Sequence, residues 1–210
     1  MVQTILVINP KGGAGKTTLA TNLPGFLAWN GETVTLGDMD RQQSSLHWLS
    51  IRSPDLPQIH GWDARDDNLD KPPASSNYLI LDAPAGIHGK ELGNALRHAN
   101  KVLVPVQPSL FDMWATSEFF DALKEHKALR HHHVEIGVIG MRIDPRTRAA
   151  ATLQHYFEKY ELPVITNLRD TQVYIQAAAM GETLFDLPRS QSERELEHWL
   201  PLIDWVRAKK

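Results

Sequence analysis

A glycine-rich octet near the N terminus, Lys-Gly-Gly-Ala-Gly-Lys-Thr-Thr at residues 11–18, constrains this chain more than any other feature. It follows a short apolar run at residues 4–9 and precedes a segment of helical character at residues 17–30. That order predicts a strand, a loop and a helix. Glycines let successive backbone N–H groups turn toward one anion, and the helix N-terminus adds partial positive charge. The octet therefore predicts a phosphate-binding loop, in preference to a plain glycine turn with solvated lysines.

The members of this loop have separate expected tasks. Lys16 is expected to reach the β- and γ-phosphates, and the Thr17 hydroxyl is a candidate Mg²⁺ ligand. The strict Walker A pattern fails, because Pro10 occupies its first glycine position, and a second lysine, Lys11, follows instead. The full set of expected phosphate contacts is Lys11, Gly12, Gly13, Ala14, Gly15, Lys16, Thr17 and Thr18.

Apolar runs alternate with helical segments along the rest of the 210-residue chain. Strands are expected at residues 33–36, 78–81, 101–106, 135–141 and 162–165, and helices at residues 91–99, 117–129 and 149–160. The proline-rich stretch at residues 53–76 is expected to be mostly loop. This alternation predicts an α/β fold, a mostly parallel sheet with helices on both faces. The length suits a single domain over residues 1–210.

Carboxylates follow two of the expected strands. Asp38 and Asp40 come after the strand at residues 33–36, and Asp82 follows the strand at residues 78–81. Because parallel strands end at one edge of a sheet, these side chains are expected beside the phosphate loop, where ligands bind in such folds. For Asp38 and Asp40 taken alone, a polar strand-to-loop turn is the alternative.

These segments together resemble the ParA/MinD family of ATPases with a deviant Walker A motif. The resemblance rests on the octet and on the motifs at residues 38–44, 79–86, 104–109 and 172–174, with Gly181 and Phe185, and it is closest to small plasmid-type ParA proteins. The chain departs from the family pattern at Arg41, where proline is common, and at Gly37, where a larger apolar residue is usual.

The resemblance implies a P-loop NTPase fold, Mg²⁺-dependent ATP hydrolysis and a homodimer that forms around ATP. In that arrangement Lys11 contacts phosphate across the dimer interface and acts in catalysis with Lys16 and Asp40. Asp40 orients the attacking water, while Asp38 and Asp82 hold Mg²⁺ through its waters. The implied function is partition or positioning of a plasmid, a chromosome region or a protein cargo, with a ParB-like or other adaptor protein stimulating hydrolysis.

Charge bears on the choice of partner. The formal net charge is -3 and the pI is about 6.4, so the whole molecule does not attract DNA, and any contact requires a local patch. Candidates are Arg142, Arg146, Arg148, Arg169, Arg207, Lys209 and Lys210. A solvated surface balanced by acidic neighbours is the alternative. The family resemblance favours non-specific, salt-dependent DNA binding in the ATP state.

Two other functions remain as alternatives. A MinD-like positioning ATPase requires an amphipathic membrane tail, but in residues 193–210 Pro201 interrupts the apolar stripe and three glutamates oppose anionic lipid. We therefore expect no stable membrane binding. A metabolic P-loop ligase or kinase stays open, although the absence of cysteine excludes a thiolate-held metal cluster. With no apolar stretch near ~18 residues, a cytoplasmic location is expected, and the family resemblance implies association with the nucleoid.

The histidine run at residues 131–133 offers a different kind of site. Adjacent histidines on a loop do not converge easily on one ion, so an exposed connection is favoured over a metal site.

Overall fold

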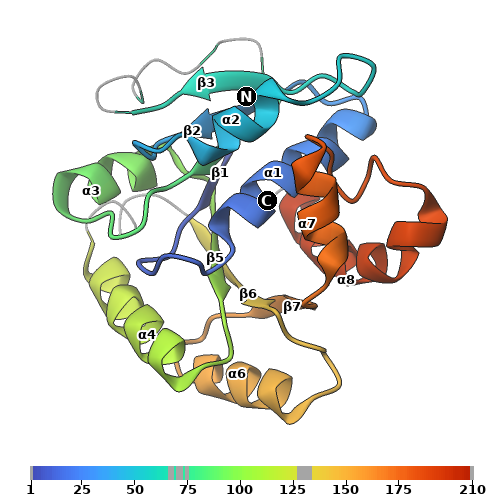
Figure 1. Ribbon diagram of the computed structural model, residues 1–210. Helices are drawn as coiled ribbons and strands as arrows, with labels where there is room; N and C mark the ends of the chain where they lie inside the picture. Colours follow the sequence, from blue (N-terminus) through green and yellow to red (C-terminus); the bar gives the residue numbers. More distant parts are fainter. Residues whose placement is uncertain (1, 66–68, 70–72, 74–75, 127–133, 209–210) are drawn as a thin grey trace.

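The computed structural model describes residues 2–65, 69, 73, 76–126 and 134–208, and Figure 1 shows a central sheet between two groups of helices. The sheet has seven strands in the order β3-β2-β4-β1-β5-β6-β7, and every pair of neighbours is parallel. The strands are β1 (Gln3–Val7), β2 (Val34–Asp38), β3 (His60–Asp63), β4 (Tyr78–Asp82), β5 (Lys101–Val106), β6 (Glu135–Met141) and β7 (Val164–Leu168). The predicted parallel α/β fold is confirmed.

Helices cover both faces of this sheet. One face carries α1 (Lys16–Trp29), α2 (Ser44–Ser50), α7 (Gln172–Ala179) and α8 (Arg189–Arg207), and the other carries α3 (Gly89–His98), α4 (Leu110–Glu125) and α6 (Arg148–Glu158) (Figure 1). Alternate residues of β1 enter the two cores: Ile5 and Val7 pack with α1 and α8, and Leu6 packs with α3 and α4. Burial on both faces explains why the central strands read as continuous apolar runs.

The stretch at residues 53–76 contains a strand that the sequence analysis missed. Residues 60–63 form β3, which pairs with β2 from Thr35↔His60 to Asp38↔Asp63. The prediction of loop is wrong there, because an edge strand pairs on one side only and His-Gly-Trp-Asp lacks the apolar pattern of a buried strand. Several residues of the same stretch lie outside the described part of the chain.

Other boundaries differ for local reasons. Strand β7 begins at Val164 and not at residue 162, since Pro163 lacks an N–H and Glu161, two residues before it, has a positive φ of 57°. Helix α4 begins at Leu110 and not at residue 117, because the Ser109 hydroxyl caps it by accepting from the Asp112 N–H. The short helices α2 and α7 were not predicted, and the histidine run at residues 131–133 falls outside the described residues.

The topology fixes where a ligand site can form. Strand β1 lies between β4 and β5, so the chain crosses from one half of the sheet to the other beside it. At the carboxyl edge Val7 pairs with Asp82, and Asp82 pairs in turn with Asp38. The octet and both carboxylate motifs therefore meet at one edge of the sheet, as predicted. No helix in the described ranges has the length and apolar character needed to cross a membrane.

Candidate nucleotide site

The phosphate loop runs from the end of β1 to the first turn of α1, and two of its glycines have conformations that other residues rarely adopt. Gly13 has a φ of 75° and Gly15, the N-cap of α1, has a φ of 99°. A Cβ atom on Gly15 would lie 2.6 Å from the Met141 Cε atom. At Gly12 and Gly13 an added Cβ would meet nothing within 4 Å, so the loop backbone is open on that side. This is the open backbone cradle that a phosphate group requires.

Lys16 points back over this loop. Its Nζ donates hydrogen bonds to the carbonyl oxygens of Asn9, at 3.1 Å, and Lys11, at 2.9 Å. The side chain is buried, which lowers the pKa of Lys16, while the charges of Asp82 and Asp40 act in the opposite direction. A buried cation held against backbone carbonyls by one flexible stem can turn to an anionic ligand that enters the loop.

Thr17 and Asp82 form the polar centre of the site. The Thr17 hydroxyl donates to Oδ2 of Asp82 at 2.9 Å. Oδ1 of the same carboxyl is buried and has no hydrogen-bond partner among the described residues. Burial, helped by the charge of Asp38, raises the pKa of Asp82 to about 7 against the opposing hydrogen bond from Thr17. A hydroxyl and an orphaned carboxylate oxygen are the oxygen donors that Mg²⁺ prefers, so these residues fit such an ion.

The raised pKa of Asp82 predicts how stability depends on pH. Because its folded pKa of about 7 exceeds the ordinary 3.8, its stabilising contribution is full below pH 3.8 and is lost as pH rises through about 7. Asp82→Asn keeps the shape of the neutral carboxyl and removes this titration. We expect the variant to gain stability over the wild type as pH rises from 4 to 8, measured by urea unfolding without nucleotide or metal. A difference in the free energy of unfolding that stays constant from pH 4 to 8 would contradict a raised pKa for Asp82.

Asp38 is fully buried behind the site, and its oxygens are already occupied. Oδ1 accepts from the Asp40 N–H at 2.9 Å, and Oδ2 accepts from the Ser45 N–H, the Ser45 hydroxyl and the Leu46 N–H at 3.0, 2.7 and 3.3 Å. A carboxylate at the first turn of a helix is favoured by the partial positive charge there. Asp38 therefore ties the β2–α2 loop, which carries Asp40, to the start of α2.

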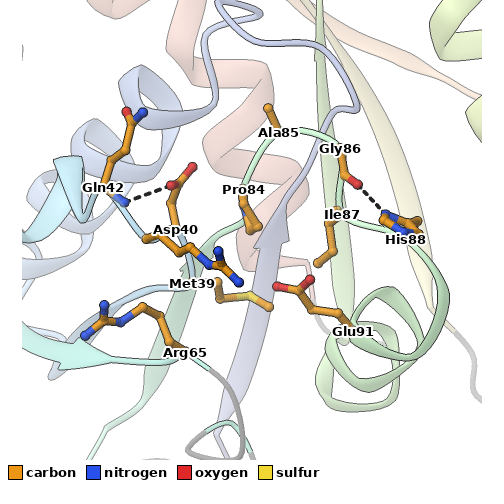
Figure 2. Close-up of a pocket in the computed structure, with 11 residues that line it drawn as sticks. Met39, Asp40, Gln42, Arg65, Pro84, Ala85, Gly86, Ile87, His88 and Glu91 are labelled. Carbon is orange, nitrogen blue, oxygen red and sulfur yellow. Dashed lines mark hydrogen bonds between the residues drawn. The ribbon is translucent and has the colours of Figure 1, made fainter.

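Asp40 lies between two hollows in the surface. One, of about 450 Å³, contains the phosphate loop, and the other, of about 740 Å³, extends toward α3. Figure 2 shows the second hollow, with Asp40 and Gln42 on one side and the chain from Ala85 to His88 on the other. Oδ1 of Asp40 accepts from the Gln42 N–H at 2.9 Å. Asp40 is thus the predicted carboxylate that borders the phosphate cleft without being buried.

Most of the predicted residues meet in the smaller hollow. Its lining includes Gly12, Gly13, Gly15, Lys16, Thr17, Thr18, Asp40 and Asp82. Three predicted residues do not line it: Ala14 is buried under the loop, Asp38 lies behind Asp40, and Lys11 points to α4. The structure adds Arg142, which the sequence analysis grouped with surface arginines and which has a positive φ of 57°.

Comparison with known proteins agrees with this geometry. Residues 5–184 match the CobQ/CobB/MinD/ParA nucleotide binding domain. The chain belongs to that family. A ParA/MinD-type chain was the prediction, and it is confirmed. Among curated relatives, the maintenance of carboxysome distribution protein A of Halothiobacillus neapolitanus is 27% identical over 191 residues, covering 88% of this chain and 87% of the relative. The chromosome-partitioning ATPase Soj of Thermus thermophilus is 28% identical over 224 residues, covering 87% of each protein.

Solved structures share the fold of this ParA/MinD-type chain. An ATP complex of a variant McdA from Cyanothece has a TM-score of 0.74 at 19% identity and covers 100% of this chain and 97% of its own. The septum site-determining protein MinD of Pyrococcus horikoshii, solved with Mg-ADP, has a TM-score of 0.71 at 16% identity and covers 99% and 96%. Nucleotide, and in one case Mg²⁺, therefore occurs in neighbours of the same fold.

The ParA/MinD-type loop also has contacts that its sequence did not reveal. The Gln107 side-chain amide donates to the Gly13 carbonyl at 2.7 Å, and the Lys11 ammonium lies 3.1 Å from Oδ1 of Asp112. Gln107 falls within the motif at residues 104–109, which was the available signal for it. Asp112 carried no signal, since it falls within the connection expected between the strand at residues 101–106 and the helix at residues 117–129.

Proposed function

We propose that this protein is a Mg²⁺-dependent ATPase that dimerises around ATP, binds DNA non-specifically in the ATP state, and drives partition or positioning of a plasmid, a chromosome region or a protein cargo. The observation that carries the proposal is a phosphate loop with two lysines that point in different directions. Lys16 is buried over its own loop, whereas the Lys11 side chain is 37% exposed and leaves it. A second lysine whose side chain leaves its own phosphate loop is placed to contact phosphate that is bound in the loop of another copy of the chain.

Within one protomer, the loop amides and the N-terminus of α1 bind the phosphates, and Lys16 turns from backbone carbonyls to the β- and γ-phosphates. Thr17 and Asp82 would hold Mg²⁺, which supplies charge neutralisation on the phosphates. The expectation that Asp38 also faces the ion through a water stays a prediction. Its four hydrogen bonds support a separate role for Asp38, which is to fix the position of Asp40.

Asp40 is assigned to the attacking water. Its carboxylate borders the phosphate cleft, and hydrogen bonds from Gln42 and to Asp38 fix the loop that carries it. A carboxylate in this position accepts a hydrogen bond from water and aligns it for in-line attack on the γ-phosphorus.

Two exposed aromatic residues support the dimer. Phe111 and Trp114 are 72% and 51% exposed on α4, stacked edge to face with ring centroids 6.1 Å apart. They flank Asp112, the residue that contacts Lys11. If Lys11 reaches the phosphate of a second copy, the first turn of α4 must lie at the same interface. Burial between two copies then gives these rings the apolar contact that they lack in one protomer.

The proposed cellular role rests on the family and its named relatives, among them a chromosome-partitioning ATPase and a carboxysome distribution protein. Exposed arginines such as Arg146, in the loop before α6, and Arg148, the first residue of α6, are candidates for phosphate contacts with DNA. From the resemblance to ParA proteins we infer a stimulating adaptor protein of the ParB-like kind and a nucleoid-associated location. The membrane alternative is weakened by α8, whose apolar residues Trp199, Leu202 and Val206 are buried in the core.

Light scattering with and without ATP tests the proposal. With Mg²⁺ and a slowly hydrolysed ATP analogue, the wild-type chain is expected to shift from monomer to dimer and to be retained on DNA at low salt. Lys11→Ala removes the cross-contact but leaves Lys16 in place. It is therefore expected to bind ATP and to stay monomeric. A wild-type chain that binds ATP yet remains monomeric and passes through DNA resin would refute the proposal.

A further inference from the structure

Arg41 lies at the corner of the tight turn that carries Asp40. The Gln43 N–H donates to the Asp40 carbonyl at 3.1 Å, which closes a turn over residues 40–43 with Arg41 at its second position. Carboxylates fix the rest of the turn, since Asp38 accepts from the Asp40 N–H and Asp40 accepts from the Gln42 N–H. The second position of such a turn favours proline, whose ring fixes the backbone. Arginine has no such constraint, so the turn depends on the two aspartates and not on the Arg41 side chain.

The Arg41 side chain is exposed and lines the larger hollow, of about 740 Å³, beside the phosphate cleft. Asp40 and Ala85 line both hollows, which therefore adjoin at these residues (Figure 2). In the part of the chain that the structure describes, the Arg41 guanidinium has no hydrogen bond and no ion pair. Arg65 lines the same hollow, but its NH2 atom lies 2.6 Å from an oxygen of Asp63. Arg41 can therefore turn out of the hollow without breaking a contact, whereas Arg65 cannot.

The topology places Arg41 at one particular end of a bound triphosphate. Thr17 and Asp82, which fit Mg²⁺, mark the end of the cleft where the β- and γ-phosphates would lie. Asp82 ends β4 and Asp40 follows β2, and both strands lie on the same side of β1. Arg142 also lines the cleft, but it follows β6 on the other side of β1. Arg41 is thus beside the terminal phosphate, and Arg142 is beside the opposite end of the nucleotide.

The charges at this end of the cleft leave a place for a second cation. Asp40 and Asp82 line it with carboxylates, and Lys16 is the cation placed over the loop. A phosphoryl group in transfer carries charge on several oxygens at once, and a planar guanidinium can contact two of them together. Because Arg41 follows Asp40 directly in the chain, rotation about its own side-chain bonds carries the guanidinium past Asp40 toward that phosphate. The backbone of the turn need not move.

We propose that Arg41 is a further catalytic residue, whose guanidinium turns from the larger hollow to the terminal phosphate of ATP and stabilises its charge as water attacks. In that step the water oxygen bonds to the γ-phosphorus, and the bond to the β–γ bridging oxygen breaks with its electron pair passing to ADP. One water proton stays on the phosphate and the other passes to solvent. This inference rests on the proposed ATP hydrolysis. It adds a cation from the same protomer to the Lys11 that a second copy supplies in the proposed dimer.

The test is Arg41→Ala, with turnover measured as phosphate release in the absence of DNA and adaptor. Turnover should fall roughly 10²- to 10³-fold, as when one preorganised donor to transition-state charge is removed. The affinity for ADP should not change, because ADP lacks the phosphate that Arg41 contacts, and light scattering should still show dimers with the ATP analogue. Arg41→Lys keeps the charge but not the planar fork, so it should recover only part of the turnover. Arg97→Ala, at an exposed position of α3, is the matched control and should turn over like the wild type.

Added guanidinium ion distinguishes a catalytic role from a structural one. At concentrations far below those that unfold proteins, it should restore part of the turnover of Arg41→Ala and none of that of Asp40→Ala. If the wild type hydrolyses ATP and Arg41→Ala does so at the same rate, the inference is refuted and the proposed ATPase stands. A loss of ADP affinity in Arg41→Ala would also overturn it, since the residue would then shape the cleft. If the wild type does not hydrolyse ATP, both proposals fail.

Discussion

Asp40→Ala is expected to lower ATP turnover by about 10²- to 10⁴-fold while ATP-bound dimers persist, which is the range lost with a positioned acid–base group. Asp40 borders the phosphate cleft, and the hydrogen bonds described for it join it to Asp38 and Gln42 and not to the loop proposed to bind the phosphates. Its removal therefore leaves binding intact and deprives the attacking water of an acceptor. Phosphate release under single-turnover conditions measures the rate, and light scattering with ATP itself measures the dimer.

Lys16→Ala provides the contrast. Lys16 is buried over the loop, and its ammonium is the cation placed to meet the phosphates, so this variant is expected to lose nucleotide binding, and with it both turnover and pairing. Asp40→Asn, which keeps the side-chain volume, serves as a second control for packing. Equal loss of ATP binding in the Asp40 and Lys16 variants would contradict separate roles for the two residues.

Asp186→Ala is expected to cause the largest loss of stability, about 3–5 kcal/mol, as for other broken buried ion pairs. The Asp186 side chain is 0% exposed and pairs with Arg52, whose NH1 and NH2 atoms lie 2.7 and 3.0 Å from its oxygens. It also accepts from the Thr183 N–H at 2.7 Å and from the Trp29 indole at 2.6 Å. Removal leaves the Arg52 guanidinium buried without its carboxylate, and urea unfolding at pH 7 measures the cost.

The direction in which stability changes with pH provides a second test of the Arg52–Asp186 pair. Burial alone would raise the pKa of Asp186, but hydrogen bonds from Arg52 and Thr183 outweigh it, and the net pKa is lowered. Its contribution is therefore present above the ordinary carboxyl range and is lost as pH falls through the folded pKa. The difference in the free energy of unfolding between the wild type and Asp186→Ala should therefore become smaller at acidic pH. Arg97→Ala, an exposed arginine on α3, is the matched control and should stay within about 0.5 kcal/mol of wild type.

The nucleotide site was predictable because the residues that form it lie in a few short segments, each recognisable from its own sequence. The octet at residues 11–18 carries its own backbone freedom and charge, and the aspartates that end β2 and β4 are brought beside it by any parallel sheet. Apolar runs, which are also local, predicted most of the strands and helices along the chain. The edge strand β3 was not predicted because it pairs on one side only and lacks the apolar pattern of a buried strand. Helices α2 and α7 were not predicted because seven or eight residues are too few to show a clear helical period.

The sequence by itself determined that this chain carries a glycine loop suited to phosphate at the carboxyl edge of a parallel sheet, since those features depend on residues that are neighbours along the chain. Only the tertiary structure decided that Asp38 accepts hydrogen bonds from the first turn of α2, that Asp112 contacts Lys11, and that Arg52 pairs with Asp186, 134 residues away. Each of these contacts joins segments whose approach is set by packing of helices on the sheet. No local pattern records which charged side chain will meet which partner once that packing is complete.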